Sequence, residues 1–202
     1  MMSNLEHLAL QVVNRMFIEV EASGRHVHLT KEQSQILFGC TLEPSRPLSQ
    51  PGQFVSKQRV SIVGPKGSFA NVAVLGPERK EGQVEISLTD AVSLGLTPPI
   101  RLSGQIQNTP GILLRGPVGE LTLSCGVIVA QRHIHLDPES AKVRGLKDGD
   151  VVKVKILTCR PVIFEDVVVR VHPSFSPRVH IDFDEANACA YRKGDWGMIL
   201  RE

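Results

Sequence analysis

The stretch RHVHL at residues 25–29 recurs as RHIHL at residues 132–136. In an extended strand, the side chains at positions i and i+2 lie on the same face of the backbone. Both copies can therefore direct two imidazole rings toward one point. Such a pair suits a metal ion, although histidines also occur on strands that are half exposed to solvent. The repetition of the whole stretch predicts that the chain contains two related halves.

A second pair of segments supports an internal duplication. VEISLTDAVSLG begins at Val84 and VHIDFDEANACA begins at Val179, and both run from a strand of alternating apolar residues into the start of a helix. On the face opposite the apolar residues, the first segment carries Glu85 and the second carries His180. Each half thus contributes a His-x-His pair and one further residue that can bind a metal.

These residues form a candidate metal site with six ligands. Imidazole and carboxylate groups are the usual ligands of zinc and related divalent ions, and six of them suffice for two ions. The sequence predicts two divalent metal ions, with zinc as the favoured element. The predicted ligands are His26, His28, Glu85, His133, His135 and His180.

The remaining pattern is typical of a mainly β protein. Segments rich in β-branched residues, RVSIV at 59–63, FANVAVL at 69–75 and VVKVKIL at 151–157, alternate with turns built from glycine and proline. Short helices are predicted after each His-x-His pair, because Thr30 and Asp137 are suitable N-cap residues. The expected fold is two similar small closed β-barrels with short capping helices, related by internal duplication.

Three segments are expected along the chain. Residues 1–22 hold an N-terminal amphipathic helix and a lead-in strand, since apolar residues from Leu5 to Phe17 recur with helical spacing. Residues 23–115 are expected to form the first barrel half and residues 116–202 the second. Interleaving of the chain between the two barrels is compatible with this division.

Composition argues against several classes of function. The net charge is +2, basic and acidic residues are mixed along the chain, and aromatic residues make up 4%, so a nucleic-acid partner is not expected. The longest apolar runs, such as GVIVA at 126–130, are too short to span a membrane. The four cysteines have no Cys-x-x-Cys spacing, and we expect them to be reduced, buried thiols.

Four motifs, in order along the chain, carry a family resemblance. RHVHL, GPERKEGQVEIS, RHIHL and HIDFDEANA resemble those of the PduL-type phosphotransacylases, or phosphate propanoyltransferases, of bacterial microcompartments, over the chain from Ser23 to Leu200. The resemblance implies two closed β-barrels, partly interleaved in the chain, with a dinuclear zinc site between them. It also implies that the six residues named above are the ligands and that Arg79 holds phosphate.

The reaction implied by this resemblance converts acyl-CoA and phosphate into acyl phosphate and CoA, with propanoyl-CoA or acetyl-CoA as the substrate. Two divalent ions can polarise the thioester carbonyl and stabilise the departing thiolate, so that no side-chain nucleophile is required. The guanidinium of Arg79 suits bidentate phosphate binding. Arg25 and Arg132 precede the paired histidines and are expected to orient the ligands or to bind CoA phosphates.

Two other interpretations of the predicted metal site stay open. The same ions could deliver hydroxide, which would make the protein a metal-dependent thioester or phosphoester hydrolase. Closed coordination would instead make it a structural or binding module. The family resemblance favours the acyltransferase, in the bacterial cytoplasm inside a microcompartment for propanediol degradation. Shell or core enzymes are the implied partners, and a homo-oligomer is a compatible assembly.

Overall fold

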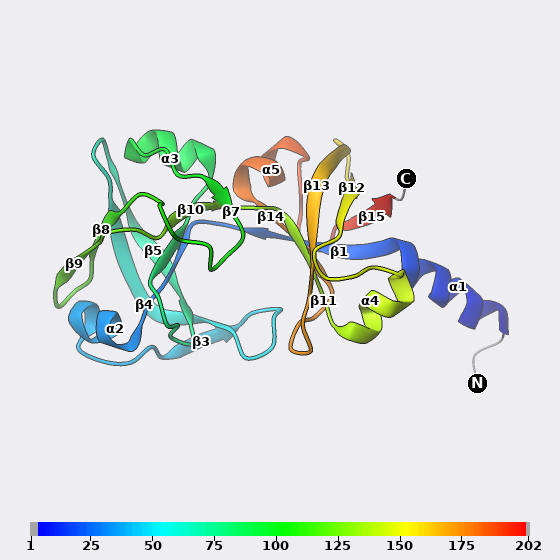
Figure 1. The fold of residues 1–202 in the computed structure, drawn as a ribbon, viewed down its shortest axis with the longest axis horizontal. Helices are drawn as coiled ribbons and strands as arrows, with labels where there is room; N and C mark the ends of the chain where they lie inside the picture. Colours follow the sequence, from blue (N-terminus) through cyan, green and yellow to red (C-terminus); the bar gives the residue numbers. More distant parts are fainter. Residues whose placement is uncertain (1–3, 201–202) are drawn as a thin grey trace. The chain divides into compact units, whose positions relative to one another are not determined.

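The computed structural model describes residues 4–200, and the chain divides into two compact units (Figure 1). The first, which we call the barrel unit, contains the chain up to Ser23 and again from Arg132 onward. The second, the sheet unit, is Gly24–Gln131. The barrel unit is thus made from both ends of the chain. The predicted halves at 23–115 and 116–202 are divided according to the sequence repeat. The two units of the structure are instead divided according to the contacts within each unit.

Six strands form the barrel unit: β1 (Phe17–Ser23), β11 (His133–Leu136), β12 (Val151–Leu157), β13 (Val162–Val171), β14 (Arg178–Asp182) and β15 (Trp196–Leu200). They make a closed barrel in the order β1-β14-β11-β13-β12-β15. β1 pairs in parallel with β14 and antiparallel with β15, so the N-terminal strand closes the barrel. Inward-facing residues of these strands build an apolar core that includes Ile18, Val20, Ile134, Val154 and Ile181.

The strands of the sheet unit are β2 (His26–His28), β3 (Pro44–Pro47), β4 (Phe54–Val63), β5 (Ser68–Gly76), β6 (Gln83–Glu85), β7 (Ile100–Arg101), β8 (Ile112–Arg115), β9 (Glu120–Leu123) and β10 (Val127–Ala130). They form a nine-stranded sheet in the order β7-β10-β6-β2-β5-β4-β8-β9, with β3 paired to β4. Closure of a barrel requires hydrogen bonds between the two edge strands. Among the described residues, no ladder joins the edges β7 and β9. The prediction of two closed barrels is therefore correct for the barrel unit and wrong for the sheet unit.

Four short helices follow strands of the two units: α2 (Lys31–Phe38), α3 (Leu88–Leu94), α4 (Pro138–Arg144) and α5 (Phe183–Ala188). The predicted N-caps are confirmed, since the side chains of Thr30 and Asp137 each accept a hydrogen bond from a backbone N–H of the first helical turn. Ser87 and Asp182 cap α3 and α5 in the same way. Each helix start thus lies directly after a strand that carries a predicted metal ligand.

The N-terminal helix α1 (Asn4–Met16) confirms the helix predicted from the apolar spacing. Its residues Leu5, Leu8 and Val12 are nevertheless exposed, at 75%, 56% and 49%. The helix contacts α4, β1 and β15 of the barrel unit, but this apolar stripe is not covered by them. No helix within residues 4–200 is long and apolar enough to cross a membrane.

The four cysteines are free thiols, as expected, but they differ in burial. Cys189 is buried, Cys40 and Cys125 are partly buried, and Cys159 is exposed. Burial raises the pKa of the Cys189 thiol. The expectation of buried thiols is thus correct for Cys189 and wrong for Cys159.

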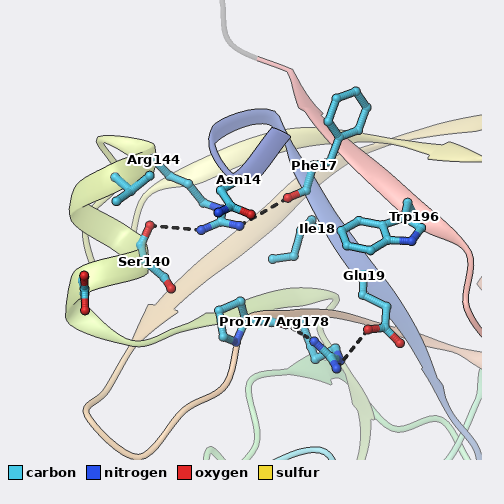
Figure 2. Close-up of a pocket in the computed structure, with 11 residues that line it drawn as sticks. Asn14, Phe17, Ile18, Glu19, Ser140, Arg144, Pro177, Arg178 and Trp196 are labelled. Atoms are coloured by element: carbon cyan, nitrogen blue, oxygen red, sulfur yellow. Dashed lines mark hydrogen bonds and ion pairs between the residues drawn. The ribbon is translucent and has the colours of Figure 1, made fainter. Parts of the chain in front are cut away.

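A buried arginine links α4 to the strand that closes the barrel (Figure 2). Arg144 is only 6% exposed and lines a cavity of about 340 Å³ beside β1 and β15. Its Nη2 donates to the carbonyl of Phe17 at 3.2 Å, and its Nη1 donates to the carbonyl of Ser140 at 3.3 Å. Burial lowers the pKa of Arg144, and Asp137 raises it by less. The guanidinium is therefore a cross-link between the helix and the start of β1.

Replacing Arg144 with Ala removes both charge-assisted hydrogen bonds, so we expect the barrel unit to lose about 2–4 kcal/mol of stability. Trp196, the single tryptophan, lies on β15, so its fluorescence during urea unfolding reports on this unit. Lys153→Ala is the matched control, because it breaks the exposed pair with Glu165 in the same barrel and should cost less than about 1 kcal/mol. Equal urea concentrations at the midpoint of unfolding for Arg144→Ala and the wild type would contradict the proposed cross-link.

Candidate functional site

The sheet unit brings three of the predicted ligands together. His26 and His28 lie on β2, which pairs antiparallel with β6, and His26 lies directly opposite Glu85 in that ladder. Because alternate residues share a face, His28 points the same way as His26. One ligand atom from each of the three lies within 4.8 Å of those of the other two. We call His26, His28 and Glu85 the first cluster.

The orientation of the first cluster is set by backbone and side-chain contacts. The Nδ1 atom of His26 lies 2.8 Å from the carbonyl oxygen of Gly24. A carbonyl only accepts, so Nδ1 carries the hydrogen, and Nε2 faces Oε2 of Glu85 at 3.5 Å. The Nε2 atom of His28 lies 3.9 Å from Oε1 of Glu85. Two Nε2 atoms and a carboxylate thus converge on one point.

Burial and neighbouring charges shift the pKa of all three groups of the first cluster. Burial by itself raises the pKa of the Glu85 carboxyl, but His26 and His28 lower it by more, so it is ionised. A hydrogen bond with Ser103 lowers that pKa further. Burial holds the pKa of His28 well below its usual range, helped by His26 and Arg79, so its imidazole is neutral. For His26, burial opposes charging, but Glu85 outweighs it and the pKa is raised.

The barrel unit brings the other three predicted ligands together. His133 and His135 lie on β11, which pairs antiparallel with β14, and His133 lies opposite His180. The ring centroids of the three histidines are 4.6–5.1 Å apart, and their ligand atoms lie within 4.8 Å of one another. The His135 ring also stacks on Phe175 at 3.9 Å. We call His133, His135 and His180 the second cluster.

The same ladder geometry builds both clusters. In each unit, the first histidine of the His-x-His strand faces the third ligand across an antiparallel pair. The other edge of that strand pairs in parallel, β2 with β5 and β11 with β13. Glu85 and His180, which align in the sequence, thus also occupy matching positions in the strand pairing of the two units. The internal duplication itself stays a prediction.

Arg25 and Arg132 bind acidic residues in the first turns of α3 and α5. Arg25 makes two hydrogen bonds to Asp90, at 2.6 and 3.0 Å, and its guanidinium lies over the ring of Phe69. Arg132 donates to Glu185 at 2.9 Å. Asp90 and Glu185 occupy the same position of a capping box in α3 and α5. These contacts tie each His-x-His strand to a helix start, and a role of the two arginines toward CoA stays a prediction.

Arg79 lies in the segment between β5 and β6, in the same unit as the first cluster. Its backbone N–H donates to the carbonyl of Leu29, and its Nη1 donates to Oγ of Ser103 at 3.0 Å. Its charge acts on both histidines of the first cluster, lowering the pKa of each. The structure therefore brings the predicted phosphate-binding residue close to three of the six predicted ligands.

Two polar residues next to Glu85 were not found from the sequence. Gln83 donates from Nε2 to Oε1 of Glu85 at 2.6 Å, and to Oγ of Ser103 at 2.9 Å. Gln83 could have been noticed, because it lies two residues before Glu85 and so shares its face of the strand. Ser103 follows β7 in a stretch without a motif, and only the folded chain brings it to the cluster.

Comparison with known proteins points to one family. The family described as phosphate propanoyltransferase matches residues 19–192. The chain is 57% identical over 182 residues to a phosphate propanoyltransferase of Leptotrichia buccalis, covering 89% of this chain and 86% of the relative. It is 52% identical over 185 residues to one of Enterococcus faecalis, covering 91% and 88%. It is 50% identical over 202 residues to one of Listeria monocytogenes, covering 99% and 95%.

The donor sets predict that each cluster binds one metal ion. We expect the zinc-loaded, desalted protein to hold about two zinc ions per chain, and His28→Ala to hold about one, since loss of one of three ligands weakens a site strongly. His172→Ala is the control, because His172 is exposed and bonds locally to Ser174. The measurement is elemental analysis with circular dichroism to check folding. A folded His28→Ala variant that keeps both ions would rule out the first cluster as a metal site.

Proposed function

Since this chain belongs to the phosphate propanoyltransferase family and is a phosphate acyltransferase, we propose that it works with two divalent metal ions. The substrate is propanoyl-CoA or acetyl-CoA, and the products are acyl phosphate and CoA. Zinc is the favoured metal. The observation that carries the proposal is the pair of buried or half-buried clusters, each with three side chains whose ligand atoms converge.

The donor chemistry supports a catalytic kind of metal site. The first cluster offers two imidazoles and a carboxylate, and the second offers three imidazoles. Sets of three protein ligands are typical of catalytic zinc, where a further position is left for water or substrate. A bound ion would supply Lewis acidity for the thioester carbonyl and for the departing thiolate. The neutral His28 and the ionised Glu85 have the protonation states that metal ligands require.

Arg79 is the proposed phosphate-binding residue. Its guanidinium is held by Ser103, and its planar array of N–H donors matches the oxygens of a phosphate ion. Phosphate bound there would stand beside the first cluster, because Arg79 acts on the pKa of both of its histidines. Arg79 thereby helps to orient the attacking oxygen and to offset its charge.

The cellular setting is a further part of the proposal. We place the protein inside a bacterial microcompartment, in propanediol degradation, with shell or core enzymes as partners. The supporting observation is the exposed apolar stripe of α1, formed by residues that include Leu5 and Leu8. An uncovered amphipathic helix is suited to dock its apolar side on a partner.

Removal of residues 4–15 should leave phosphate-dependent turnover in solution unchanged and abolish co-purification with microcompartment shells, because the helix is the docking element. A chain with Leu5 and Leu8 both replaced by Gln should keep the helix and also lose recruitment. Recruitment that survives both changes would remove α1 from this role.

The assay for the proposed reaction follows thiol release from propanoyl-CoA with and without phosphate, together with trapping of acyl phosphate by hydroxylamine. We expect release and trapped product only when phosphate is present, because phosphate is the nucleophile. Chelator-treated protein should lose turnover and regain it with zinc. Release that is independent of phosphate would instead identify a thioester hydrolase.

In the same assay, Arg79→Ala should raise the KM for phosphate about tenfold or more, since it removes a charge-assisted contact to that substrate. The KM for propanoyl-CoA should change by less than about twofold. Arg115→Ala is the control, because Arg115 lies in the same unit in an exposed pair with Glu120. An equal rise in both KM values for Arg79→Ala would contradict a phosphate-specific role.

A further inference from the structure

A phenylalanine that is not among the six predicted ligands stacks on one of them in the barrel unit. The ring centroids of Phe175 and His135 are 3.9 Å apart, and the angle between the two ring planes is 25°. His135 is 8% exposed, and Phe175 is half-buried. Stacked aromatic rings attract each other beyond the effect of the area that they bury. Phe175 lies between β13 and β14, so it reaches the second cluster from a loop and not from a strand that carries a ligand.

Backbone hydrogen bonds hold this loop against the strand of His135. The N–H of His172 donates to the carbonyl of Leu136 at 3.0 Å, and Leu136 is the residue directly after His135. The N–H of Phe175 then donates to the carbonyl of His172, also at 3.0 Å, which closes a turn. Both bonds use backbone atoms, so they do not depend on the side chain of His172. The position of Phe175 is therefore set by the backbone that follows β13.

Arg170 makes a second contact to the ring of Phe175. Arg170 lies directly opposite His135 in the parallel pairing of β11 with β13, so their side chains share a face of the sheet. The guanidinium carbon of Arg170 is 5.7 Å from the centroid of the Phe175 ring, which is within the range of a cation–π contact. Phe175 thus contacts both members of one cross-strand pair. These two contacts limit the directions that its ring can take.

Stacking on the face of an imidazole is compatible with metal binding by its nitrogens. The lone pair of an imidazole nitrogen lies in the plane of the ring, so a neighbour on the face leaves it available. The torsion that turns the ring has a broad energy minimum, and a stacked neighbour narrows it. In the first cluster, His26 is oriented in another way, by the contact of its Nδ1 atom with the carbonyl of Gly24. The two clusters therefore orient a histidine ring by different contacts.

We propose that Phe175 is a positioning residue that holds the imidazole of His135 in the orientation used for metal binding by the second cluster. The inference rests on the proposed function, in which His135 is a metal ligand. Phe175 itself contributes no donor atom. Its ring restricts rotation of the imidazole and covers one face of it against water. Removal of a partner that orients a metal-binding side chain weakens metal affinity by about 10- to 100-fold.

The test measures the second cluster by itself, in the full chain carrying His28→Ala, with cobalt(II) as the probe. His28→Ala disables the first cluster, and the visible absorption of cobalt(II) depends on the geometry of its ligands. We expect Phe175→Leu to weaken cobalt binding, measured by competition with a chelator, about tenfold and to change the visible spectrum. Phe175→Tyr keeps the ring and should bind cobalt within about threefold of the chain that carries His28→Ala alone.

Two controls separate positioning from a general structural effect. Phe183→Leu changes a phenylalanine of the same unit that is 48% exposed, and it should leave the cobalt affinity and spectrum unchanged. In a chain carrying His180→Ala, only the first cluster is intact, and Phe175→Leu should not change cobalt binding there, because other residues orient that cluster. Phe175→Met fills a similar volume without a ring and is the second variant that removes the stack. Circular dichroism checks that each variant is folded.

The outcomes distinguish this inference from the proposed function. A wild-type protein that binds no metal at either cluster would overturn both. Cobalt binding in the chain carrying His28→Ala, with unchanged affinity and spectrum in folded Phe175→Leu or Phe175→Met, would overturn the positioning role alone. Equal weakening of both clusters, or failure of Phe175→Tyr to keep the affinity, would also count against it. Loss of the fold in both variants without the ring would make Phe175 a structural residue and would likewise overturn the proposal.

Discussion

Strand register is the constraint on which the candidate site depends. In each unit, a His-x-His strand pairs antiparallel with a second strand so that the first histidine faces the third ligand. A slip of one residue would turn both histidines of a strand to its other face. The residues between the histidines, Val27 and Ile134, are fully buried in the apolar cores. Core packing therefore selects the face that the histidines share, and the ligand geometry follows from it.

Burial of a carboxylate imposes a second constraint on the sheet unit. An ionised carboxylate away from water is costly unless it has hydrogen-bond donors and opposite charge nearby. Glu85 has both, since Gln83 donates to it and His26 faces it. The polar residues around the first cluster thus stabilise the buried carboxylate in its ionised form. The second cluster has three imidazoles and no carboxylate, so it does not need the same set of donors.

Topology explains why part of the fold prediction failed. The β-branched segments correctly indicated strands, and Thr30 and Asp137 correctly indicated helix starts. Those signals depend on neighbours a few residues apart. Barrel closure depends on which strands become edges, and in the barrel unit the gap is filled by β1, which comes from the other end of the chain. The sheet unit has no such strand among its described residues, and its sheet stays open.

The sequence by itself determined the six candidate ligands and their division into two sets. The His-x-His repeat and the matching third residue of each set can be recognised from the spacing of residues within short segments. It also carried the motifs through which family membership was predicted. Only the tertiary structure decided that Arg25 and Arg132 bind helix-capping acids, and that Gln83 and Ser103 join Arg79 to Glu85. These contacts bridge as many as 65 residues along the chain. Their partners are chosen by the packing of strands and loops, which local patterns do not encode.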